Sequence, residues 1–242
     1  MAREDEFRHP RLAAIYDALD PVRDDLDVYV DIARELGARR VFDVGCGTGT
    51  LALLLAERGY DVVAVDPAAA SVAVARSKPG ADRVRWIDGD ATTPCCTDRD
   101  LALITGNAAQ AITDPAAWTA TLEGIHASLR PGGHLVFETR DPAARAWEHW
   151  TREATHRTVD IPAVGDVTSW VELTAVDLPL VSFRWTWIFG SDGATLTSDS
   201  TLRFRSREEV EAQLHATGYL SDRVRDAPDR PGLEFVFFAR RP

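Results

Sequence analysis

The feature that most restricts the fold is a regular alternation of short apolar strands with amphipathic helices. Five apolar segments of this kind are predicted as strands, the last of them after a turn at residues 130–133. They cover residues 41–44, 61–65, 84–87, 101–104 and 134–138. Strand–helix–strand order requires crossover connections, so it predicts a parallel sheet that is covered by helices on both faces.

Other patterns come before and after this alternation. Two helical patterns, near residues 11–19 and 22–36, precede the first strand. Past residue 153 the apolar period becomes two, which predicts antiparallel strands over residues 154–205. The clearest example is a stripe of large apolar side chains, formed by Val181, Phe183, Trp185, Trp187 and Phe189. The α/β pattern then resumes with a capping box at Ser206 and Glu209 and with strands near 219–225 and 233–240.

Composition excludes several classes of protein. A chain of 242 residues that is 45% hydrophobic fits one α/β domain with an insertion as readily as two small domains, and we expect one domain. The net charge of −11 argues against nucleic acid, since binding phosphate backbones needs a clustered positive surface. We see neither a secretory start nor an apolar run long enough for a membrane span, and the three cysteines do not have metal-ligand spacing. We therefore expect a cytoplasmic protein with no membrane association and no metal.

The stretch VFDVGCGTGT, residues 41–50, places three glycines at every second position after the first strand. The usual dinucleotide fingerprint is GxGxxG, but here the third glycine comes one position early. Asp43 stands two residues before the first glycine. A carboxylate beside a pyrophosphate is repelled by roughly 1 kcal/mol at a partly exposed site, whereas a sulfonium or ammonium group is attracted. The stretch therefore favours a cationic cofactor.

From these residues to the end, the chain resembles the class I S-adenosylmethionine-dependent methyltransferases. Their first motif is an acidic residue, one spacer and GxGxG, and further motifs occur here in the family's order. Asp66 closes the second strand, where the family binds the ribose hydroxyls. Asp90 and Ala91 follow the third strand, where the family binds adenine, although Asp88 is an alternative to Asp90. The resemblance implies S-adenosyl-L-methionine as cofactor, bound by Asp43, Gly45, Cys46, Gly47, Asp66, Pro67, Asp90, Ala91, Thr105 and Gly106.

The resemblance also places residues on the substrate side. Tyr16 lies in LAAIYDAL, which is similar to the lid helix of several small-molecule methyltransferases. Asn107 and Gln110 leave the fourth strand, and Arg140 leaves the fifth. Arg140 has two interpretations: it binds an acidic group of the substrate, or it pairs with Glu138 or Asp141. We assign no general base, so the catalytic residues stay unknown.

The predicted fold class is α/β, a Rossmann-like seven-stranded doubly wound sheet with an antiparallel β insertion and N-terminal lid helices. Residues 1–37 form the lid, 38–153 the S-adenosylmethionine-binding core, 154–205 the insertion, and 206–242 the rest of the core. Three interpretations of the insertion stay open: it covers the substrate, it joins two subunits of a homodimer, or its stripe packs on the protein's own sheet.

The predicted function is methyl transfer from S-adenosylmethionine to a nitrogen or oxygen of a small molecule. One alternative is an adenosyl-binding module without catalytic activity. Another is a nicotinamide-dependent oxidoreductase, which the early third glycine and Asp43 disfavour.

Overall fold

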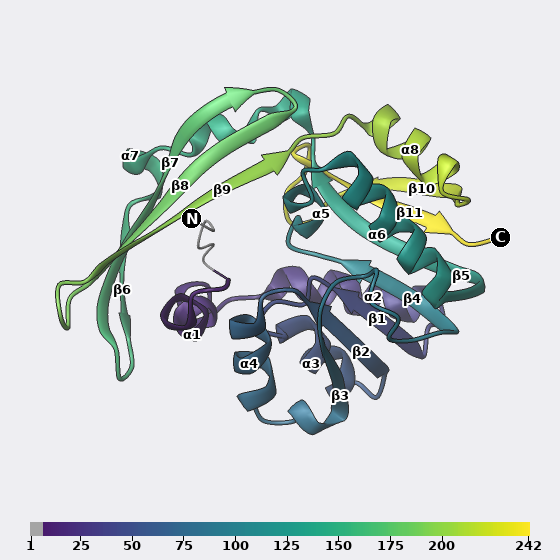
Figure 1. Cartoon of the computed structure of the whole chain (residues 1–242), viewed down its shortest axis with the longest axis horizontal. Coiled ribbons are helices and arrows are strands. Elements are labelled where there is room, and N and C mark those ends of the chain that lie inside the picture. The colour runs from purple at the N-terminus through teal and green to yellow at the C-terminus, as the bar shows by residue number, and fades with distance from the viewer. Residues whose placement is uncertain (1–6) are drawn as a thin grey trace.

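A computed structural model describes residues 7–242 and contains two sheets (Figure 1). The larger sheet has seven strands in the order β10-β11-β5-β4-β1-β2-β3. Strands β1 to β5 pair in parallel, and β11 runs antiparallel to its neighbours β5 and β10. These strands are β1 (Arg40–Val44), β2 (Asp61–Asp66), β3 (Val84–Asp88), β4 (Arg99–Ile104), β5 (Leu129–Arg140), β10 (Leu220–Asp226) and β11 (Glu234–Arg240). The predicted fold class is confirmed.

The strand order reverses between β1 and β4. From β1 the chain builds outward through β2 to β3, then returns to add β4 and β5 on the other side of β1. In open α/β sheets, ligands bind outside the carboxyl ends of the strands at such a reversal of strand order. The glycine stretch lies at this switch point.

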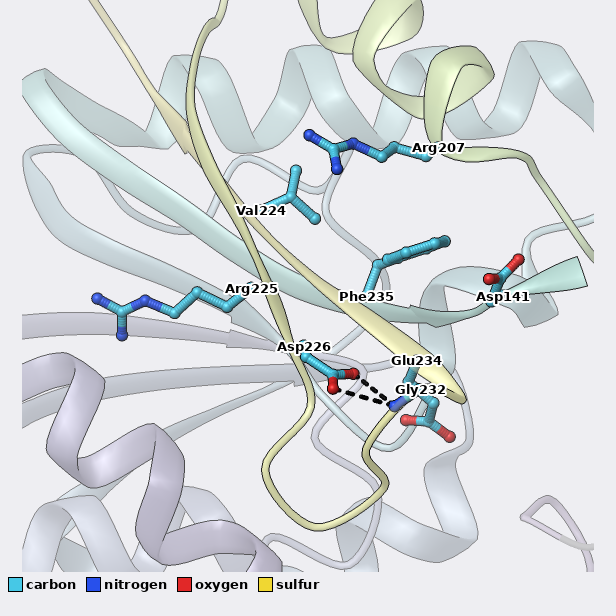
Figure 2. Close-up of a pocket in the computed structure, with 8 residues that line it drawn as sticks. All are labelled: Asp141, Arg207, Val224, Arg225, Asp226, Gly232, Glu234 and Phe235. Carbon is cyan, nitrogen blue, oxygen red and sulfur yellow. Dashed lines mark hydrogen bonds between the residues drawn. The ribbon is translucent and has the colours of Figure 1, made fainter. Parts of the chain in front are cut away.

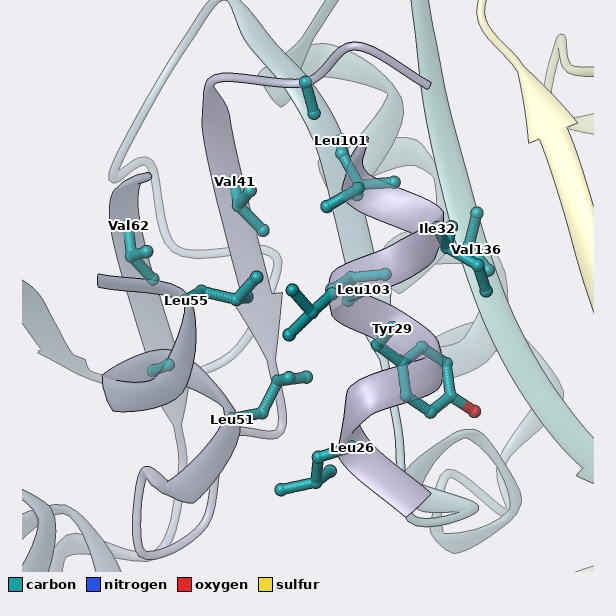
Figure 3. Packing of buried hydrophobic residues seen from close by; sticks show 14 of the residues in the cluster. Leu26, Tyr29, Ile32, Val41, Leu51, Leu55, Val62, Leu101, Leu103 and Val136 are labelled. Carbon is teal, nitrogen blue, oxygen red and sulfur yellow. The ribbon is translucent and has the colours of Figure 1, made fainter. Parts of the chain in front are cut away.

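Two buried clusters cover the two faces of the large sheet, because alternate strand residues point to opposite faces. In β4, Leu103 belongs to one cluster and Ile104 to the other. The first cluster lies under α2 (Asp27–Glu35) and α3 (Thr50–Glu57), as Figure 3 shows. The second lies under α6 (Pro115–Ser128) and α8 (Arg207–Ala216). Each fully buried Leu or Ile contributes about 1.5–3 kcal/mol, so these two clusters hold the core together.

The remaining helical segments are short or lie outside these two clusters. They are α1 (Pro10–Leu19), α4 (Ala69–Ser77), α5 (Ala108–Ala111), α7 (Arg152–Thr155) and four 3-10 turns at Asp24–Leu26, Ala81–Arg83, Pro142–Ala144 and Ala146–His149.

Two boundaries differ from the sequence prediction. The second N-terminal helix begins at Asp27 rather than at residue 22, because a 3-10 turn precedes it. Strand β5 begins at Leu129 and includes the turn at 130–133. There its pairing with β4 shifts register, and Gly132 takes a left-handed φ of 78°. The turn is thus an irregularity within the strand, not its start.

The second sheet is the predicted antiparallel insertion, in the order β6-β7-β8-β9. Its strands are β6 (Arg157–Ile161), β7 (Gly165–Asp177), β8 (Leu180–Phe189) and β9 (Thr195–Arg203). At one end of the apolar stripe, Val181 packs with Trp147 and Phe204. At the other end, Phe189 is buried with Leu12 of α1, over which the sheet curves in Figure 1. The ends of the stripe therefore pack on helical segments of this chain rather than on the large sheet.

Helix α6 approaches the loop after β3 at Gly124. A Cβ added there would lie 2.2 Å from the carbonyl oxygen of Ala91 and 2.9 Å from its carbonyl carbon. Because both are backbone atoms, neither can rotate away. Packing at Gly124 thus fixes the position of the loop that carries Asp90 and Ala91.

We expect Gly124→Ala to lower the free energy of unfolding by about 1–3 kcal/mol, because the added methyl group overpacks this contact. Urea unfolding followed by circular dichroism measures the change. The control is Glu123→Ala, an exposed neighbour on the same helix, which should change the value by less than about 0.5 kcal/mol. Equal stability of the two variants would contradict the close approach.

Candidate functional site

The three glycines of the first turn play different structural roles. Gly45, Gly47 and Gly49 have φ values of 75°, 53° and 81°, which side chains rarely adopt. A Cβ on Gly49 would lie 2.4 Å from the ring of Trp86, so packing against β3 requires the third glycine. A Cβ on Gly47 would meet nothing within 4 Å. The backbone at Gly47 therefore borders open space that a ligand can use.

Asp66, at the end of β2, connects this turn to its neighbours. Its Oδ2 accepts a hydrogen bond from the Gly47 N–H at 2.8 Å, and its Oδ1 accepts from the Ala68 N–H at 2.7 Å. Its backbone carbonyl accepts from the Gly89 N–H at 3.1 Å. Each carboxylate oxygen can accept more than one bond. Asp66 thus fixes three loops at this edge and retains acceptor capacity for hydroxyl groups.

Asp43 carries a buried carboxylate that its surroundings stabilise poorly. The residue is 1% exposed, and its buried Oδ2 has no hydrogen-bond partner. Burial, with the nearby negative charge of Asp66, raises the pKa of Asp43 to about 7. An added cationic group would favour the ionised carboxylate.

Cys46 lies in the same turn and carries a thiol. Burial, with the nearby charges of Asp43 and Asp66, raises the pKa of Cys46 well above its usual value. The thiol therefore stays protonated at neutral pH, which argues against a nucleophile at this position.

Two aspartates lie near the end of β3. The carboxylate of Asp88 forms an ion pair with Arg76 at 3.0 Å. Asp90 is exposed, and its Oδ1 accepts hydrogen bonds from the N–H and the hydroxyl of Thr92 at 2.8 and 2.5 Å. Ala91 is buried beside Gly124. Both aspartates therefore already have partners, Asp88 in an ion pair and Asp90 in hydrogen bonds.

The turn after β4 lies directly against the glycine turn. A Cβ on Gly45 would come within 3.1 Å of the Ala108 Cβ, so Thr105, Gly106 and Asn107 lie beside the end of β1. Asn107 has a φ of 58° and is buried. The structure thus brings together, at one edge, the predicted cofactor residues of all four turns.

A buried hydrogen-bond network holds Asn107 in this conformation. Its backbone N–H donates to Glu138 Oε1 at 2.9 Å, and its Nδ2 donates to Glu234 Oε1 at 3.0 Å. Its Oδ1 is buried without a partner. Burial and the neighbouring Glu234 raise the pKa of Glu138 to about 7. Sequence reasoning missed this positioning role of Glu138 and Glu234.

Arg140 does not have the partners that the sequence suggested. Its Nη1 donates to Gln110 Oε1 at 3.0 Å, and its Nε lies 3.6 Å from Glu234 Oε1. The prediction that Arg140 pairs with Glu138 or Asp141 is wrong, because β11 places Glu234 directly across from it.

Gln110 and Tyr16 have different surroundings. Gln110 is fully buried, and its Nε2 donates to the carbonyl of Arg203 in β9 at 3.4 Å, so it links the core to the antiparallel sheet. Tyr16, on α1, is 37% exposed, and its ring lies 5.4 Å from that of Phe7.

A pocket of about 250 Å³ is lined by residues at the end of β10 and the start of β11, and by Asp141 just past β5 (Figure 2). Asp226 accepts two hydrogen bonds from the Gly232 N–H at 2.8 and 3.0 Å, which shapes the loop beside it. The lining residues are Asp141, Arg207, Val224, Arg225, Asp226, Gly232, Glu234 and Phe235. Both arginines and carboxylates line it, so the pocket has no single sign of charge.

No group of three or more His, Cys, Asp or Glu side chains within residues 7–242 is placed to hold a metal ion. No helix in the same range is long and apolar enough to cross a membrane.

Comparison with known proteins agrees with this geometry. Residues 41–133 match the family model described as a methyltransferase domain. The chain is 33% identical to a ubiquinone biosynthesis O-methyltransferase of Xanthomonas oryzae pv. oryzae over 181 residues, which cover 68% of this chain and 72% of the relative. It is also 33% identical to a cypemycin N-terminal methyltransferase of Streptomyces sp over 119 residues, 49% of each chain. The chain thus spans about half the length of that relative.

A solved structure extends the fold comparison to nearly the whole chain. An S-adenosylmethionine-bound amino pentose methyltransferase from Micromonospora echinaspora superposes with a TM-score of 0.71 at 24% identity. The match covers 94% of this chain and 97% of the other. The chain belongs to the class I S-adenosylmethionine-dependent methyltransferases.

The raised pKa of Asp43 predicts an unusual dependence of stability on pH. The folded state holds the proton of Asp43 more tightly than the unfolded state does. The stabilisation that this proton gives to the fold is therefore complete below about pH 4 and is lost as pH rises to about 7. Because asparagine does not titrate, we expect the fall in the free energy of unfolding between about pH 4 and pH 7 to be smaller by about 2–4 kcal/mol in Asp43→Asn. Urea unfolding of both proteins at several pH values measures the difference. Parallel curves would contradict the raised pKa.

Proposed function

We propose that this protein transfers the methyl group of S-adenosylmethionine to a nitrogen or oxygen atom of a small molecule. The observation that carries the proposal is the combination, at one sheet edge, of open backbone at Gly47, the oriented carboxylate of Asp66 and the unpaired buried oxygen of Asp43. A buried carboxylate without a partner suits a cation and repels a pyrophosphate. The residues present therefore fit this cofactor better than a nicotinamide dinucleotide.

We assign the cofactor's parts to the turns in chain order. Asp66 accepts from the ribose hydroxyls, with Pro67 beside it, because its carboxylate retains acceptor capacity. Asp90 and Ala91 bind adenine. Asp43 and the turn Gly45–Cys46–Gly47 face the charged methionine part. Thr105 and Gly106 lie nearest the reacting methyl, since Ala108 packs against Gly45.

S-adenosylmethionine supplies an activated methyl group and its own leaving group. The protein supplies proximity and orientation, which account for roughly 7–11 kcal/mol of such a barrier. An amine must present a neutral lone pair, whereas a hydroxyl group needs a positioned base. The relatives' names include both an N-terminal and an O-methyltransferase, which supports nitrogen and oxygen equally.

Tyr16 and Arg140 are the proposed substrate-side residues that stay partly exposed. Asn107 and Gln110 support the site from within the buried network. We propose that the described part of the N-terminal unit, residues 7–37, and the insertion, residues 154–205, cover the substrate, because α1 and β8 share a buried cluster. A homodimer through the insertion is a further proposal, which size-exclusion chromatography tests.

We expect Asp66→Ala to weaken binding of S-adenosylmethionine by about 1–3 kcal/mol, because the ribose hydroxyls lose a charged acceptor. Isothermal titration calorimetry measures the affinity. The matched control is Asp61→Ala, at the opposite end of the same strand, which should bind like the unaltered protein. Equal affinities of the two variants would contradict the assignment of Asp66.

Calorimetry and an activity screen separate the three functions. We expect saturable binding of S-adenosylmethionine and S-adenosylhomocysteine and none of NAD or NADP. Saturable NAD binding without adenosyl binding would instead support an oxidoreductase. Release of S-adenosylhomocysteine with one member of a metabolite panel shows catalysis. Cofactor binding with no turnover across the panel favours the binding module.

A further inference from the structure

Helix α1 is attached to the antiparallel sheet by a broad apolar contact. Leu12 and Ile15 belong to one buried cluster with Phe189 of β8. Arg11 adds a two-pronged pairing with Asp192, at 2.9 and 3.1 Å. Because buried apolar contacts are the dominant source of cohesion, this side of the helix stays with the sheet.

The opposite side of α1 is attached to the glycine turn through one carboxylate. Asp17 Oδ1 accepts hydrogen bonds from the hydroxyls of Thr48 at 2.6 Å and Thr50 at 3.3 Å. Asp17 Oδ2 lies 2.5 Å from the ammonium nitrogen of Lys78, just past the end of α4. Thr48 and Thr50 flank Gly49. Asp17 therefore joins the lid helix to both helices that follow the first two strands.

The segment before α1 makes a second attachment on the same side. The hydroxyl of Ser71 donates to the carbonyl oxygen of Phe7 at 2.9 Å, and Arg8 donates to the carbonyl oxygen of Pro67 at 3.2 Å. Residues 7–19 thus contact the loops after β1 and β2. The proposed function assigns these same two loops to the cofactor.

We propose that Asp17 and Lys78 form a latch that closes α1 over the cofactor and sets the rate at which S-adenosylhomocysteine leaves. The inference rests on the proposed function, since it concerns the same two loops. The side chains of Asp17 and Lys78 are 38% and 22% exposed. A partly exposed ion pair is weaker than a buried apolar cluster, so the latch opens first and α1 moves with the antiparallel sheet.

This latch makes Asp17 and Lys78 positioning residues. They hold Thr48 and Thr50, and through them the glycine turn, without occupying the place of the methyl group. Loss of the latch should therefore change cofactor exchange more than it changes fold stability. Lys78 is the only lysine in the chain, so its side-chain amine can be followed without interference from other lysines.

The first experiment measures release of S-adenosylhomocysteine by stopped-flow tryptophan fluorescence. We expect Asp17→Asn and Lys78→Met each to raise the dissociation rate constant about 5- to 30-fold, in the range of one charge-assisted contact. The dissociation rate constant of the double variant should be at most about threefold above that of either single variant, because both substitutions break the same ion pair. Lys78→Arg keeps the charge and should restore slow release.

The control is Arg58→Met, which breaks the exposed ion pair between Arg58 and Asp27, away from α1. It should leave the dissociation rate unchanged. Rates equal to those of the unaltered protein in both Asp17→Asn and Lys78→Met would overturn the latch. Circular dichroism confirms that each variant is folded before its rate is compared.

The second experiment uses acetylation by sulfo-N-hydroxysuccinimide acetate, read by mass spectrometry. The single lysine gives one side-chain signal, and the α-amino group of the chain serves as an internal reference. We expect S-adenosylhomocysteine to slow acetylation of Lys78 relative to the reference about tenfold, and Asp17→Asn to abolish this protection. Bound ligand without protection would overturn the latch.

These outcomes separate the two proposals. If the unaltered protein binds S-adenosylhomocysteine and Asp66→Ala weakens binding, the cofactor assignment stands whatever the latch variants do. If the unaltered protein shows no saturable binding of S-adenosylhomocysteine, the proposed function is wrong, and so is the latch proposal that rests on it.

Discussion

The carboxylate of Asp66 is the interaction on which the rest of the site depends. It accepts from Gly47 and Ala68, while its carbonyl accepts from Gly89, so one residue fixes the loops after three adjacent strands. The glycine turn needs such support because three residues in left-handed conformations have little preference for one geometry. Packing of Gly49 under Trp86 completes the restraint and leaves Gly47 beside open space. A rigid backbone next to an empty volume is what a positioned cofactor requires.

Electrostatics divide the sheet edge into two parts. Around β1 and β2, buried Asp43 lies close to Asp66, which suits a cationic ligand. Around β4, β5 and β11, the carboxylates of Glu138 and Glu234 are engaged by Asn107 and Arg140. Where we place the cofactor, one oxygen of Asp43 has no hydrogen-bond partner, whereas beside it Glu138 and Glu234 both accept hydrogen bonds from Asn107. This contrast separates a binding position from a supporting network, although both consist of buried carboxylates.

The antiparallel sheet and α1 act as one structural unit above the core. Apolar side chains hold α1 to β8, whereas hydrogen bonds and one ion pair hold it to the glycine turn. The two kinds of attachment differ in how easily they break. Water competes well for exposed polar contacts but not for a buried cluster. A hinged cover follows from this difference, without any strain in the backbone.

The sequence by itself determined the strands, their order of appearance and the residues at their carboxyl ends. Asp43, Asp66 and Asp90 could be placed at one edge because parallel strands always end on the same side of a sheet. Tertiary structure alone decided the partners of Arg140 and Asn107, since Glu234 comes from β11, far along the chain. It also decided the contact of Asp17 with Thr48 and Lys78, which no local pattern indicates. Periodicity reports which way a residue faces, whereas contacts between distant segments depend on how the whole chain packs.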